Sequence, residues 1–240
     1  AWTGLPWIFW AYERTRDPQV APHRAAIGLG LAWTWLALTG TQWFLLLIIP
    51  FLAYVVLREA ATWLATRHEG PGFWRVLGKL IYTGLLAGLV LVGLTLFYYW
   101  PSLREANLLW SSRYIEAYPA SSRWSIPWQV LGEILWRRWQ PGFAPFDWDL
   151  ARIVPNMSWY IGLPICLLAV LGLARRCQWT QTIPLFGLLA LSMLLVTGPS
   201  VPYNPAYFVV RRIPFISDSV RNAFRYLWPA SFALAALAGL

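Results

Sequence analysis

Two arginines near the C-terminus, Arg221 and Arg225, have a type and spacing suited to binding a phosphate. They are four residues apart and so share one face of a helix, for which Asp218 or Ser219 is a suitable N-cap. A helix N-terminus already carries about half a positive charge, so two guanidinium groups there favour a bound anion. Phosphate or pyrophosphate fits such a site. The alternative is that both side chains snorkel to ordinary lipid headgroups.

Three further groups could do chemistry, each with a simpler alternative. Arg212 follows another arginine and adds to the positive field before Arg221, although snorkelling explains it as well. Arg113 lies among hydroxyl side chains and could bind a phosphate or a sugar, or could be a solvated loop residue. Asp147 and Asp149 could ligate a divalent cation or supply a base, or could form a polar turn.

No cofactor or metal site is predicted. The chain lacks a phosphate-binding Gly-Lys loop, a dinucleotide-binding glycine pattern and a nucleophile elbow. His23 and His68 lie beside basic residues and are expected to be solvated. The spacing of Cys166 and Cys177 suits neither a metal nor a disulfide. A divalent cation is compatible with a phosphorylated substrate, but no residue pattern indicates one.

The elements that must position these residues are apolar helices. Hydrophobic residues make up 58% of the 240 residues, and mean hydropathy is +0.50, both typical of a membrane protein. Six runs predict membrane spans: 25–40, 43–57, 80–99, 159–174, 182–198 and 224–240. An aromatic-rich segment at the N-terminus predicts a seventh, partial span. The predicted fold is therefore an all-α polytopic transmembrane bundle, forming a single membrane domain over residues 1–240.

The distribution of charge predicts an orientation. The net charge is +9, but the apolar spans assign the basic residues to membrane edges rather than to nucleic acid. Short basic segments lie in the cytoplasm under the positive-inside rule, which places 11–24, 58–79 and 175–181 there. The long loop 100–158 is then extracytoplasmic, and the protein is expected in the plasma (inner) membrane of a bacterium.

The loop 100–158 is too long for a simple connector and is expected to be partly helical. We expect Pro101 to end the span 80–99. Ser102 then caps a loop helix over 102–118, and a second helix covers 127–139. Both are amphipathic and are expected to lie along the membrane surface.

Three stretches resemble bacterial polytopic glycosyltransferases of the GT-C superfamily, in the YfhO-like and mannosyltransferase-like group. The first is the hairpin LTGTQWFLLLIIPFLAYVVL. The second is SWYIGL running into CLLAVLGLARR. The third begins TGPSVPYNPAYFVVRRIPF and leads, through an Arg-x-x-x-Arg stretch, into an Ala/Leu/Gly-rich helix. Together these stretches cover about a third of the chain.

The resemblance implies an enzyme that transfers a sugar from a polyprenyl-phosphate donor to an extracytoplasmic acceptor. The donor phosphate would lie near Arg221 and Arg225, with Arg113 a second contact. In this superfamily the catalytic acid usually lies in the first external loop. The sequence begins at Ala1 inside an apolar segment, so we interpret it as an internal piece of a longer protein without that loop. No catalytic residue is therefore assigned.

Two other functions fit the same composition. A transporter of lipids or lipid-linked oligosaccharides would need polar residues at mid-membrane depth, and Thr34, Thr95 and Ser192 are the best candidates. A non-catalytic membrane scaffold subunit would need no concave site near Arg221.

Overall fold

The computed structural model describes residues 4–39, 41–66, 73–104, 163–174, 179–198, 201, 203–212 and 226–240. Nearly all of these residues lie in helices, and there is no strand among them. The prediction of an all-α fold is thus confirmed for the described part of the chain. The expected loop helices lie outside it, apart from residues 102–104.

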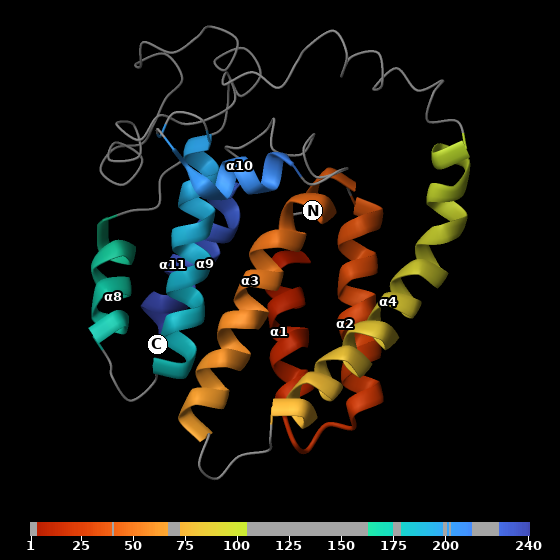
Figure 1. Ribbon diagram of the computed structural model, residues 1–240, viewed down its shortest axis with the longest axis horizontal. Helices are drawn as coiled ribbons and strands as arrows, with labels where there is room; N and C mark the ends of the chain where they lie inside the picture. The colour runs from red at the N-terminus through yellow and green to blue at the C-terminus, as the bar shows by residue number, and fades with distance from the viewer. Residues whose placement is uncertain are drawn as a thin grey trace, which may run out of the picture. The chain divides into compact units, whose positions relative to one another are not determined.

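The chain forms two units: Ala1–Phe51 with Thr62–Pro119, and Leu52–Ala61 with Ala120–Leu240. The described helices of the first unit run alternately up and down (Figure 1), and helix α3 contributes to both units. The helices in order are α1 (Gly4–Arg16), α2 (Pro22–Thr39), α3 (Thr41–Thr66), α4 (Phe73–Arg104), α8 (Leu163–Ala174), α9 (Trp179–Thr197), α10 (Pro205–Arg211) and α11 (Leu227–Gly239).

Three of these helices have the length and apolar composition needed to cross a membrane, which indicates an integral membrane protein. They overlap the predicted spans 43–57, 80–99 and 182–198. The three candidate spans are Leu47–Thr66 in α3, Trp74–Pro101 in α4 and Trp179–Thr197 in α9. The other predicted runs coincide with α2 and with two shorter apolar helices, Pro164–Leu173 and Leu227–Gly239.

An aromatic cluster around Phe51 holds α1 and α2 against the first half of α3. The Phe51 ring lies 5.7 Å from Phe9, 5.8 Å from Tyr12 and 5.1 Å from Trp33, centroid to centroid. All three contacts are edge-on, the arrangement that aromatic quadrupoles prefer. One ring on α3 therefore links two other helices of the first unit.

Helices α2 and α4 approach each other closely at Gly30. A Cβ added at Gly30 would lie 2.7 Å from the Ala87 carbonyl oxygen and 2.8 Å from the Val90 Cβ. The absence of a side chain is thus what lets the two backbones meet, as in many membrane helix pairs. Further along the same pair, the Tyr99 hydroxyl donates to the Ala37 carbonyl.

Aromatic side chains mark both ends of the α4 span. Trp74 is 78% exposed at one end and Trp100 is 60% exposed at the other. At 1.5 Å per residue they lie about 39 Å apart along the helix axis, close to the thickness of a bilayer with its headgroup regions. This placement matches the interfacial belts of membrane proteins.

The prediction that Pro101 ends this helix is wrong. Helix α4 continues through Pro101 to Arg104, so Ser102 lies in its last turn and does not cap a new helix there. Proline removes one N–H donor, which the Phe97 carbonyl would otherwise use. At the edge of a candidate span water can hydrate that carbonyl, so the helix tolerates the loss.

In the second unit, α11 packs against both α8 and α9. A Cβ added at Gly172, late in α8, would collide with the Leu237 carbonyl oxygen, late in α11. The two helices therefore touch backbone to backbone at corresponding ends. Leu188 and Leu195 from α9 and Ala233 from α11 are fully buried.

Candidate functional site

A single asparagine joins the end of α9 to the start of α10. Gly198 turns the chain with a φ of 50°, a conformation that glycine adopts without strain. The Asn204 side-chain amide nitrogen then donates to the carbonyl oxygens of Leu194, at 2.6 Å, and Gly198, at 2.9 Å. Its side-chain oxygen accepts from the Tyr207 backbone N–H at 3.2 Å. The fully buried Asn204 thus satisfies the last carbonyls of one helix and caps the next.

Helix α10 forms because its first residues have the right chemistry. Asn204 is the N-cap and Pro205 occupies the first turn, where the missing proline N–H costs nothing. Tyr207 and Val210 are buried, three residues apart, on one side of the helix. The backbone N–H of Arg212 closes the other end by donating to the Val209 and Val210 carbonyls.

The predicted phosphate-binding residues are described only in part. The Arg212 side chain is exposed directly after α10. Arg113, Arg221 and Arg225 lie outside the described residues, as do Asp147 and Asp149. The described part of α11 begins at Leu227, with Tyr226 as its N-cap residue. The clustering of the arginines around a phosphate therefore stays a prediction.

A transporter would need polar residues inside its spans. In the first unit, the candidate threonines form hydrogen bonds within their own helices. The buried Thr34 hydroxyl donates to the Gly30 carbonyl at 2.8 Å, and the buried Thr95 hydroxyl donates to the Leu91 carbonyl at 2.7 Å. Each bond stays within its own helix, which is the usual way that Thr is accommodated there. Ser192 is fully buried in α9, in the second unit. These threonines give no support to a transport path.

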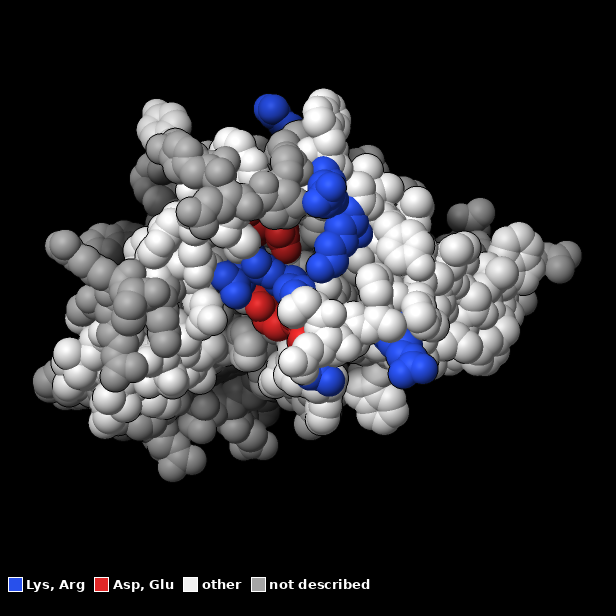
Figure 2. Space-filling model, turned by 90° about the horizontal axis from the view of Figure 1, so that it is seen from below, with Lys and Arg blue, Asp and Glu red and all other residues white. Residues whose placement is uncertain are grey.

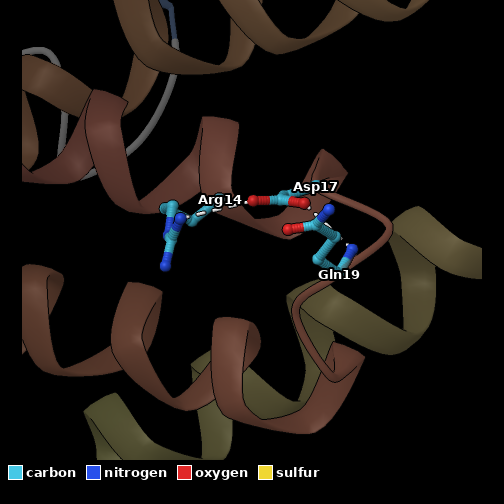
Figure 3. Close-up of polar contacts among 3 residues, drawn as sticks. All are labelled: Arg14, Asp17 and Gln19. Carbon is cyan, nitrogen blue, oxygen red and sulfur yellow. Dashed lines mark hydrogen bonds and ion pairs between the residues drawn. The ribbon is translucent and has the colours of Figure 1, made fainter.

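Charged side chains of the first unit lie at the end where α1 and α3 terminate. The Arg16 Nη2 donates to the Thr62 hydroxyl at 2.6 Å, which brings the ends of α1 and α3 together. The turn after α1 is held by Asp17, which pairs with the Arg14 guanidinium at 3.3 Å and accepts from the Gln19 backbone N–H at 2.9 Å (Figure 3). Figure 2 shows Lys, Arg, Asp and Glu side chains on the face of the molecule seen from below.

This end matches part of the predicted cytoplasmic side. The segments 11–24 and 58–79 were expected on one side of the membrane, and the bond between Arg16 and Thr62 joins them. His23 is exposed, as expected, although it lies in the first turn of α2 rather than in a loop, and His68 lies outside the described residues. Which side of the membrane this end faces is a prediction from the positive-inside rule.

Sequence reasoning missed a buried cation, Arg58, in the second unit. It was counted among the basic residues of the cytoplasmic segment 58–79, but it is only 8% exposed within α3. Its Nη1 donates to the Thr180 carbonyl at 2.7 Å. In an α-helix that carbonyl would accept from the residue four positions later, which is Pro184, a residue without an N–H. Arg58 thus takes the place of a donor that α9 lacks.

Exchanging Pro184 for alanine should make Arg58 less important for stability. We expect Arg58→Met to lower the free energy of unfolding by about 1–3 kcal/mol, because it removes a donor from a partly buried carbonyl. In a Pro184→Ala background the cost should fall, since the substituted alanine supplies an N–H to the same carbonyl. The coupling between the two residues is measured by unfolding four proteins in mixed micelles: the wild type, the two single variants and the double variant. Equal costs in both backgrounds would show that the Thr180 carbonyl is not the partner that matters.

No group of His, Cys, Asp or Glu residues able to hold a metal ion occurs in the part of the chain that the structure describes. Among those residues, the candidate site consists of the α9–α10 turn and the exposed Arg212 that follows α10. No family model, curated protein or solved structure matches this chain.

Proposed function

We propose that this chain forms the phosphate-binding part of a membrane glycosyltransferase, which takes a sugar from a polyprenyl-phosphate donor. The proposal includes the six predicted spans and the partial seventh. It also includes the extracytoplasmic placement of the loop 100–158 and of the α9–α10 turn in the plasma membrane. The acceptor is a hydroxyl-bearing lipid, polymer or protein.

The observation that carries the proposal is the position of α10. Asn204 bonds to carbonyls at the end of a candidate span, so α10 begins at the level of the membrane edge. The helix ends at Arg211, and Arg212 follows with an exposed side chain. A guanidinium group at this depth is at the level of lipid phosphates. Arg221 and Arg225 follow within the next thirteen residues of the sequence.

A cluster of arginines would stabilise the leaving phosphate in the transfer reaction. A carboxylate removes the proton of the acceptor hydroxyl, whose oxygen then forms a bond to the anomeric carbon of the sugar. The bond from that carbon to the donor phosphate breaks, and its electron pair leaves with polyprenyl phosphate. Arginines that hold the departing phosphate stabilise its growing negative charge.

The intrahelical hydrogen bonds of the Thr34 and Thr95 hydroxyls favour the glycosyltransferase over the transporter. Both side chains donate within their own helices and so offer no donor to a passing headgroup.

Removing the two paired arginines should abolish transfer. In the protein expressed from its complete reading frame and held in nanodiscs, Arg221→Ala and Arg225→Ala should each lower transfer from polyprenyl-phosphate sugars at least about 100-fold, the loss typical of a removed transition-state contact. Arg75→Ala is the matched control, since Arg75 is an exposed arginine in the first turns of α4.

A binding measurement tests the phosphate site without knowing the sugar. Native mass spectrometry should show that polyprenyl monophosphate binds in preference to polyprenol, and that both arginine variants lose this preference. Full transfer activity in the two variants, or equal binding of phosphate and alcohol, would contradict the proposal.

A further inference from the structure

Helix α10 has one buried face and one exposed apolar face. Tyr207 and Val210 are 5% and 3% exposed, whereas Phe208 and Val209 are 50% and 62% exposed on the other side of the helix. Tyr203, just before the helix, is 92% exposed. Its φ of 58° is uncommon for a bulky residue. Large apolar side chains are thus presented outward from a short, well-capped helix.

The depth of this face in the membrane follows from the bonds of Asn204. Its amide donates to the Leu194 carbonyl, inside the candidate span of α9, and to the Gly198 carbonyl just beyond that span. Helix α10 lies crosswise to α9 (Figure 1) and its seven residues extend only about 10 Å. The whole helix therefore stays near the level at which the span ends.

We propose that α10 is an interfacial anchor, lying at the boundary between lipid headgroups and acyl chains. Phe208 and Val209 contact the upper acyl chains, Tyr203 lies among the headgroups and Arg212 meets the phosphates. This arrangement places apolar, amphipathic and charged groups at the depths that each prefers. Helix α9 also presents an exposed apolar side chain, Phe186, which is 51% exposed. The anchor shares with the proposed function the depth of α10 in the membrane, but it does not require sugar transfer.

Nitroxide scanning measures the depth of this face directly. Cys166 and Cys177 are first replaced by serine, and Tyr203→Cys, Phe208→Cys and Val209→Cys are spin-labelled in nanodiscs. Labels at 208 and 209 should collide more with dissolved oxygen than with a water-soluble nickel chelate, as a lipid reference at Phe186→Cys does. A water reference at Gln19→Cys, in the exposed turn after α1, should show the reverse. The label at 203 should fall between the two references.

A carbene-forming phospholipid tests the same surface in the unaltered protein. With the diazirine near the glycerol backbone, mass mapping should find adducts on residues 203 to 209. With the diazirine at the end of the acyl chain, adducts there should be at least several-fold fewer.

Two results overturn the proposal. Labels at 208 and 209 that match the water reference show that the face lies in solvent. Labels that neither reagent reaches, together with an absence of lipid adducts, show that another part of the protein covers it.

Discussion

Replacing Gly172 with alanine should separate α8 from α11 and lower the free energy of unfolding by about 2–3 kcal/mol. A Cβ at this position would collide with the Leu237 carbonyl oxygen. Because that atom belongs to the backbone of another helix, no rotamer change can relieve the overlap. The measurement is equilibrium unfolding in mixed micelles, followed by circular dichroism or by a thermal midpoint.

The matched control for this change is Gly84→Ala in α4. A Cβ at Gly84 meets no atom within 4 Å, so alanine should be neutral or should stabilise the helix by up to about 1 kcal/mol. The same chemical change is thus expected to have opposite signs at two sites. If Gly172→Ala were as well tolerated as the control, α8 and α11 would not be in backbone contact.

Replacing Asn204 with leucine should detach α10 from α9 and cost about 3 kcal/mol of stability. The change removes two donors to the Leu194 and Gly198 carbonyls and the acceptor for the Tyr207 N–H. Asn204 is 1% exposed, so water cannot easily replace these bonds. Unfolding and protease cleavage between α9 and α10 both report the loss.

Asn204→Asp separates the two roles of the side chain. Aspartate still caps α10 by accepting from Tyr207, but its oxygens repel the two carbonyls that the amide nitrogen contacts. We therefore expect it to be nearly as harmful as leucine. Ser231→Ala serves as the control, since the Ser231 hydroxyl donates within its own helix to Leu227 and its loss should cost little. Wild-type stability in Asn204→Asp would show that the amide donors contribute nothing.

The helical spans could be predicted because hydropathy and length determine them locally. The runs 43–57, 80–99 and 182–198 each lie on a helix that can cross a membrane. Pro101 misled the prediction of the end of α4, because the cost of a proline depends on whether water reaches the freed carbonyl.

The close contacts could not be predicted, because glycine in an apolar helix has no pattern that reveals its neighbour. Gly30 and Gly172 contact the backbone of another helix. A Cβ added at Gly84 or Gly88 would meet no atom within 4 Å. Both kinds occur in similar Leu- and Ala-rich surroundings. Only the three-dimensional packing distinguishes them.

The site could be predicted only where its signal was local. The Asn-Pro pair before α10 is a recognisable helix start, and the role of Asn204 as a cap could have been found from it. Its bonds back to α9, and the burial of Arg58 against Thr180, depend on chain segments that meet only in the folded protein. The arginines chosen for phosphate binding remain to be tested by the experiments above.

The bond from Arg58 to the Thr180 carbonyl also has a consequence for biogenesis. The two residues are 122 positions apart, so a ribosome adding about 5–20 residues per second needs roughly 6–24 s to synthesise the intervening chain. During that interval the guanidinium group near the end of α3 cannot use this acceptor. Insertion of α3 into the bilayer must therefore be completed, or held at the translocon, before the cation reaches its final setting.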